Sequence, residues 1–232
     1  MAQAGELRIV SGGPMESTFG EILPAYEAAS KTRLIVRYQA MGPLLKELES
    51  GAAADVVVLS AEAMATARAK RFVDDASMTE IGRVGVGVGV KQGAPVPDIS
   101  TSQAFKSALL AAKTVAATDP TKGTSGMHFA EVLARLGIAE QMKPKLRLVD
   151  GGTGAELVAR GEAELVVQPI TVIIPVKGVT FAGPLPGELQ KISLYIGAVT
   201  KASKEAAAAK ALLAHLQAPA ARAAFVERGF EK

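Results

Sequence analysis

Hydrophobic residues along this chain alternate between short continuous runs and longer stretches in which they recur every three or four positions. Short runs bounded by turn residues are typical of buried strands, and the periodic stretches are typical of helices packed on a sheet. The predicted strands are residues 7–10, 33–38, 56–59, 84–90, 114–118, 146–149, 165–167 and 192–199. The predicted helices are residues 15–29, 44–50, 61–70, 102–112, 124–136, 154–160, 204–217 and 219–228. This order predicts an α/β fold in which helices flank mostly parallel sheets.

One predicted strand has an unusual composition. Residues 84–90 alternate strictly between valine and glycine. A strand of this kind has one face without side chains, which suits a close approach by other groups or a crossing between lobes.

Composition and charge narrow the function classes. The chain has 232 residues, no cysteine, and a net charge of +3 that is spread along the sequence rather than clustered. The missing cysteines exclude disulfides, thiolate metal sites and a cysteine nucleophile. Without a basic cluster or a nucleic-acid motif, we expect no nucleic-acid partner, whereas a mild positive field is compatible with a small anionic ligand.

Two features concern the cellular location. The longest apolar runs are far shorter than a membrane span, so the chain is not expected to be embedded in a membrane. The residues Ala2-Gln3-Ala4 have the small-x-small form that precedes a signal-peptidase cut. We therefore expect a periplasmic protein whose signal peptide has been removed. A random Ala-rich leader has the same form, and in that case a cytoplasmic oxyanion sensor is the alternative.

Three junctions between a predicted strand and a helix have an unusual composition, and two of them are rich in both glycine and hydroxyl residues. They are residues 11–15, with Ser11, Gly12, Gly13 and Met15; residues 119–126, with Lys122, Thr124 and Ser125; and residues 150–154, with Thr153. Helix N-termini at the carboxyl ends of strands bind anions through free backbone N–H groups. Any one of these segments is also what an ordinary capped turn contains. The three together favour an anion site.

Other chemistries lack their motifs. The order Lys122-Gly123-Thr124 reverses that of a Walker loop, and the glycines of residues 85–89 lack the dinucleotide-binding spacing. The two histidines, His128 and His215, do not share metal-ligand spacing, so we expect neither a metal site nor a cofactor.

Several segments resemble the periplasmic molybdate-binding proteins, receptors of ABC importers, and their wider group of extracellular solute-binding proteins. The matching segments are residues 48–55, 118–120, 133–137, 161–164 and 219–230. The resemblance implies a type II periplasmic binding fold, with one lobe of residues 1–84 plus 196–232 and a second of residues 85–195. It also implies two crossing strands, at 82–90 and 192–199, and an anion bound in the cleft between the lobes. The expected protein is a monomer, and its expected partner is an importer permease.

This chain lacks hydroxyl residues that the molybdate receptors use to bind their ligand. Molybdate receptors have hydroxyl residues where this chain has Pro14-Met15 and, after the second strand, Met41-Gly42. Each lost donor to a charged acceptor costs about 1.5–3 kcal/mol, so an organic carboxylate with an apolar part fits better than molybdate. Ligand contacts are therefore expected from Ser11, Gly12, Gly13, Met15, Met41, Gly42, Thr124, Ser125, His128, Thr153 and Gln168.

The wider group is also similar to bacterial aconitate isomerase, which leaves an enzymatic alternative open. An allylic proton shift on an unsaturated tricarboxylate needs an acid or base near the substrate carbon. His128, Glu16 and Lys122 are the candidates by position.

Overall fold

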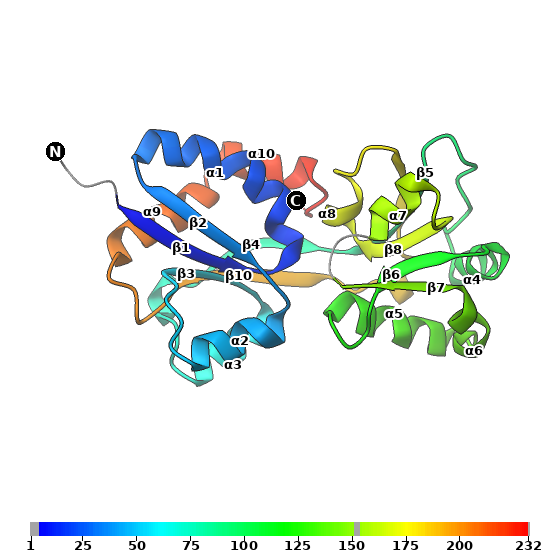
Figure 1. The fold of residues 1–232 in the computed structure, drawn as a ribbon, viewed down its shortest axis with the longest axis horizontal. Coiled ribbons are helices and arrows are strands. Elements are labelled where there is room, and N and C mark those ends of the chain that lie inside the picture. The colour runs from blue at the N-terminus through cyan, green and yellow to red at the C-terminus, as the bar shows by residue number, and fades with distance from the viewer. Residues whose placement is uncertain (1–4, 151–153, 232) are drawn as a thin grey trace. The chain divides into compact units, whose positions relative to one another are not determined.

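The computed structural model describes residues 5–150 and 154–231. They form two compact units. Unit 1 comprises residues 5–83 and 193–231, and unit 2 comprises Val84–Ile192. Each unit contains one five-stranded sheet with helices on both faces, as Figure 1 shows, which confirms the predicted α/β class.

The sheet of unit 1 has the strand order β2-β1-β3-β10-β4. Its strands are β1 (Glu6–Ser11), β2 (Arg33–Tyr38), β3 (Val56–Ser60), β4 (Thr79–Val84) and β10 (Ser193–Val199). Its α-helices are α1 (Glu16–Ser30), α2 (Met41–Glu49), α3 (Ala61–Ala69), α9 (Ala206–Leu216) and α10 (Pro219–Glu227), and its 3-10 turns are η1 (Gly13–Met15) and η2 (Asp75–Ser77). Helices α2 and α3 cover one face, while α1, α9 and α10 cover the other (Figure 1).

The sheet of unit 2 has the order β7-β6-β8-β5-β9. Its strands are β5 (Val86–Lys91), β6 (Val115–Thr118), β7 (Leu146–Val149), β8 (Leu165–Pro169) and β9 (Val179–Pro184). Its α-helices are α4 (Ser102–Ala111), α5 (Thr124–Arg135), α6 (Ala139–Met142), α7 (Gly154–Arg160) and α8 (Ile170–Ile173), and its 3-10 turns are η3 (Lys143–Lys145) and η4 (Gly187–Leu189). One core lies between the sheet and α4 and α5, and a smaller one lies under α7 and α8.

Both sheets are mixed rather than mostly parallel. Strands β2, β1 and β3 run parallel, but β10 is antiparallel to β3. Likewise β7, β6 and β8 run parallel, but β5 is antiparallel to β8 and to β9. The expected parallel pairing therefore holds for β2-β1-β3 and for β7-β6-β8, and the antiparallel pairs of β10 and β5 make both sheets mixed.

The valine–glycine segment is two strands rather than one. Strand β4 ends at Val84 in the sheet of unit 1, and β5 begins at Val86 in the sheet of unit 2. The amide of Gln190 bonds both the N–H and the C=O of Val86 at 2.8 Å, immediately after Gly85. A Cβ at Gly87 would lie 2.6 Å from Phe181, and one at Gly89 would lie 2.8 Å from Ile173. The glycines therefore serve the close approach that their pattern predicts.

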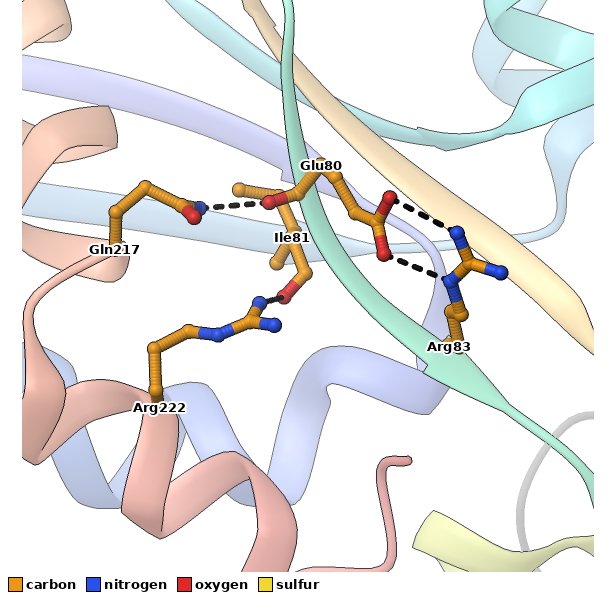
Figure 2. Close-up of polar contacts among 5 residues, drawn as sticks. All are labelled: Glu80, Ile81, Arg83, Gln217 and Arg222. Carbon is orange, nitrogen blue, oxygen red and sulfur yellow. Dashed lines mark hydrogen bonds and ion pairs between the residues drawn. The ribbon is translucent and has the colours of Figure 1, made fainter. Parts of the chain in front are cut away.

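The outer edge of β4 is covered by the C-terminal segment (Figure 2). Gln217, just after α9, donates from Nε2 to the carbonyl oxygen of Glu80 at 2.7 Å. Arg222 of α10 donates from Nη1 to the carbonyl oxygen of Ile81 at 2.9 Å. These bonds satisfy edge-strand carbonyls that would otherwise be open to pairing with another chain.

Candidate functional site

In unit 1, three parallel strands end at the same edge of the sheet with hydroxyl residues. Ser11 ends β1, Tyr38 ends β2 and Ser60 ends β3. Ser11 is fully buried, and its hydroxyl donates to the carbonyl oxygen of Gly12 at 3.3 Å. The hydroxyl of Ser60 caps α3 by accepting from the N–H of Ala63 at 3.4 Å. The two serine hydroxyls are therefore engaged in the local turns of this edge.

The glycines and methionines predicted at this edge have different roles. A Cβ at Gly12 would lie 2.6 Å from Cε of Met41 and 3.1 Å from Cε1 of Tyr195, so side chains fill the space that the prediction gave to a ligand. Met15 is completely buried in the core. Gly13 and Gly42 have no neighbour within 4 Å of a Cβ. Met41 is half-buried, and its sulfur accepts from the N–H of Ser60 at 3.5 Å.

Two tyrosines that sequence reasoning missed lie at this edge. Tyr195 of β10 pairs with Ser60 and packs its ring beside Gly12. Burial, and to a lesser extent the carboxylate of Glu16, raises the pKa of Tyr38 to about 12. Burial, with a smaller contribution from Glu62, also raises the pKa of Tyr195. Both phenols therefore stay protonated at neutral pH, and the carboxylates that contribute to the raised pKa values belong to the first turns of α1 and α3.

In unit 2, a polar cluster joins the ends of β6 and β8 to the start of α5. We call Thr118, Ser125 and Gln168 the unit 2 polar cluster. Thr118 Oγ1 accepts from Nε2 of Gln168 at 3.0 Å and from the hydroxyl of Ser125 at 3.3 Å. Thr118 is 6% exposed and Gln168 is fully buried. Ser125 and Gln168 were predicted as ligand contacts from the sequence, whereas Thr118, which hydrogen-bonds to both, was not.

The first turn of α5 lies directly against this cluster. Its N-cap residue is Gly123, which has no side chain to accept from the first N–H groups of the helix. A Cβ at Gly126 would lie 2.4 Å from the carbonyl oxygen of Thr118, so only glycine allows the helix to start this close to β6. The backbone donors of Thr124 and Ser125 are the type of group that binds an anion at a helix N-terminus.

The start of α7 packs against the same cluster. A Cβ at Gly154 would lie 2.7 Å from Oε1 of Gln168. The predicted contact Thr153 lies outside the described residues, with the rest of 151–153. Lys122 is exposed and forms an ion pair with Asp150 at 3.8 Å.

His128 has a structural partner. Its ring is buried, and Nε2 lies 2.8 Å from the carbonyl oxygen of Leu189 in η4, while Nδ1 lies 3.9 Å from a carboxylate oxygen of Glu131. The structure therefore links α5 to η4 through His128 and does not support its expected role as a proton carrier.

Among the described residues, no group of three or more His, Cys, Asp or Glu side chains is arranged to hold a metal ion.

The fold and these strand-end clusters define a class, the type II periplasmic binding proteins. The model for bacterial extracellular solute-binding proteins matches residues 7–231, so the chain belongs to this family. Across the part of the chain that the structure describes, no helix is long and apolar enough to cross a membrane.

Two curated relatives cover nearly the whole chain. Aconitate isomerase of a Pseudomonas species is 32% identical over 97% of this chain and 87% of its own length. The molybdate-binding protein of Escherichia coli strain K12 is 25% identical over 99% of this chain and 90% of its own length.

Solved structures agree on the fold. The periplasmic molybdate-binding protein of Azotobacter vinelandii has a TM-score of 0.81 at 16% identity and is covered over 99%, with 97% of this chain. The sulfate-binding protein of Mycobacterium tuberculosis has a TM-score of 0.74 at 18% identity and is covered over 86%, with 97% of this chain.

Proposed function

We propose that this chain is a monomeric periplasmic receptor that captures a small organic anion and delivers it to the membrane permease of an ABC importer. The observation that carries the proposal is the unit 2 polar cluster beside the uncapped start of α5. It offers neutral hydroxyl and amide groups next to free backbone donors, the combination that binds an anion without a counterion. Family membership supports the transport role.

The strand-end edge of unit 1 favours a ligand with an apolar part. In unit 1 the edge holds the Met41 side chain and the Tyr195 ring, together with the carboxylates of Glu16 and Glu62. These carboxylates disfavour negative charge there, since like charges repel. The charged end of the ligand is therefore assigned to the start of α5 in unit 2. A fully hydrated tetrahedral oxyanion gains little from such a surface.

Thr124→Ala with Ser125→Ala should weaken binding of the ligand more than tenfold, because two hydroxyls beside the anion are lost. The ligand is found first with a thermal-shift panel of citrate, cis-aconitate, trans-aconitate, molybdate, tungstate and sulfate. Saturation at about 100 times the dissociation constant stabilises the fold by about 2.7 kcal/mol. Isothermal titration then measures the affinity of the variant.

The matched control is Thr66→Ala with Ser107→Ala, which also removes one threonine and one serine hydroxyl, but from exposed helix positions outside the cluster. An unchanged affinity in the Thr124/Ser125 variant would mean that the start of α5 does not bind the anion. Stabilisation by molybdate or tungstate alone would replace the carboxylate with an oxyanion.

A second candidate function is isomerisation of an unsaturated tricarboxylate. The 32% identity to aconitate isomerase over nearly the whole chain favours it. The reaction moves one double bond: a base removes a proton from a CH2 carbon, and a proton returns to the far carbon of the allylic system. Glu16 is the better candidate for the base, because its exposed carboxylate lies at the first position of α1, directly after Met15 of the strand-end edge. Lys122 is engaged by Asp150, and His128 is held by Leu189.

If the chain is an isomerase, Glu16→Gln should lower turnover at least a hundredfold and leave the dissociation constant for aconitate within a few-fold. Proton NMR of trans-aconitate incubated with the protein measures the appearance of the cis isomer. Glu131→Gln, next to His128, is the control and should keep full turnover. If only Glu131→Gln lost turnover, His128 rather than Glu16 would be assigned the proton transfer. If the unmodified chain did not convert trans-aconitate, the enzymatic function would be rejected.

A further inference from the structure

A groove of about 560 Å³ lies along α3 in unit 1. Its lining residues come from α3, from the segment before β4, and from β10 and its end: Ala61, Met64, Ala65, Arg68, Ala69, Arg71, Asp75, Met78, Ile196 and Lys201. The volume falls within the range of about 300–1,000 Å³ that small-molecule sites occupy.

The floor and one wall of the groove are apolar. Met64 is fully buried, and Met78 and Ile196 are half-buried. Ala61, Ala65 and Ala69 recur every four positions, so they lie on one face of α3 and present only methyl groups. Methionine side chains adapt to ligands of irregular shape. A hydrocarbon chain would therefore lose water by lying on this floor.

The rim carries more positive than negative charge. Arg68 is neutralised by Asp75, with Nε 3.1 Å from Oδ2. Among the described residues, neither Arg71 nor Lys201 forms an ion pair. Asp74 is already bonded to Lys210, and this bond lowers its pKa more than the nearby charge of Lys201 does.

The two free cations lie on adjoining stretches of backbone. The N–H of Lys201 donates to the carbonyl oxygen of Phe72, the residue after Arg71, at 2.9 Å. This end of the groove is far along β3 from the strand-end site, because Val199 pairs with Val56 at the start of β3, whereas Ser60 ends that strand. The cationic end of the groove is therefore separate from the strand-end site, whereas Ala61 at the other end directly follows Ser60.

We propose that this groove binds a free amphiphilic anion with a single acidic head group. The head group lies beside Arg71 and Lys201, and the hydrocarbon chain covers Met78, Ile196 and the alanine face of α3. A charge-assisted pair with two otherwise unpaired cations fixes the head, and the apolar floor selects for chain length. The site does not depend on the proposed receptor function.

Arg71 also provides a test that does not endanger the fold. It follows the end of α3 in the left-handed conformation, with φ of 60°, a position at which glycine is usual. Lys31 follows the end of α1 in the same conformation, with φ of 55°, and does not line the groove. Arg71→Gly and Lys31→Gly therefore remove one cation and one strained backbone each, and neither should lower Tm.

The experiment titrates decanoate, as the probe, into the unmodified chain and both variants by isothermal calorimetry. We expect saturable binding that Arg71→Gly weakens at least fivefold and that Lys31→Gly leaves within twofold. Acetate, which has the head group alone, and decanol, which has the chain alone, should each bind at least tenfold more weakly than decanoate.

Four results would overturn the proposal. They are absence of decanoate binding at millimolar concentration, equal weakening in both variants, decanol binding as tight as decanoate, and displacement of decanoate by the anion that stabilises the strand-end site. Binding to anionic vesicles without binding of free decanoate would instead identify a membrane-surface contact and also reject it.

Discussion

Replacing Gly126 by alanine should lower the free energy of unfolding by about 2–3 kcal/mol, the upper part of the range for an overpacked site. The added Cβ would lie 2.4 Å from the carbonyl oxygen of Thr118 and 2.7 Å from that of Asp119. Both atoms belong to the backbone, so no side-chain rotation relieves the overlap. The start of α5 must move away from β6, which also separates Ser125 from Thr118.

Gly20→Ala is the matched control, because Gly20 is an exposed helical glycine with no atom within 4 Å of a Cβ. Alanine there should raise the free energy of unfolding by about 0.5–1 kcal/mol, since it restricts the unfolded backbone and favours the helix. Denaturant titration followed by circular dichroism measures both variants. If Gly126→Ala and Gly20→Ala shifted the midpoint in the same direction, the close approach of α5 to β6 would not be rigid.

The strands that could be predicted from the sequence are those formed by an uninterrupted run of apolar residues. The runs that became β3, β6 and β8 are continuous and apolar because both sheet faces are covered by helices. Strand β9 and helix α8 were missed. The segment that contains them, residues 170–191, is rich in proline and glycine, and β9 is a half-buried edge strand without a continuous apolar run.

The candidate site divides in the same way. Thr124 and Ser125 could be predicted because the start of a helix is recognisable from the local sequence. Gln168 could be predicted because it directly follows a run of apolar strand residues. Thr118 ended a predicted strand, a signal that could have identified it. The position of Tyr195 beside Gly12 depends on the antiparallel register of β10, and the partner of His128 lies 61 residues away. Neither contact leaves a local pattern.

Phe230→Ala should lower the free energy of unfolding by about 3–5 kcal/mol, the range for removing a buried phenylalanine. Phe230 is 4% exposed, and its ring packs edge to face on Phe225, with centroids 4.8 Å apart. The next residue, Glu231, donates its N–H to the carbonyl oxygen of Arg83 at 2.9 Å, beside the contacts to Glu80 and Ile81 in Figure 2. Loss of the ring therefore weakens the whole attachment of the C-terminal segment to β4.

Gly82 contacts Phe230, so the attachment of the C-terminal segment can also be tested with a second substitution besides Phe230→Ala. A Cβ at Gly82 would lie 2.4 Å from Cδ1 of Phe230, so Gly82→Ala alone should cost about 1–3 kcal/mol of unfolding free energy. In a Phe230→Ala background the obstructing ring is gone, and the same substitution should cost nothing or stabilise the strand. A double-mutant cycle measured by denaturant titration should give a coupling between the two sites of about 1–3 kcal/mol. Additive effects would mean that the ring does not lie on Gly82, and the outer edge of β4 would then depend mainly on the side chains of Gln217 and Arg222.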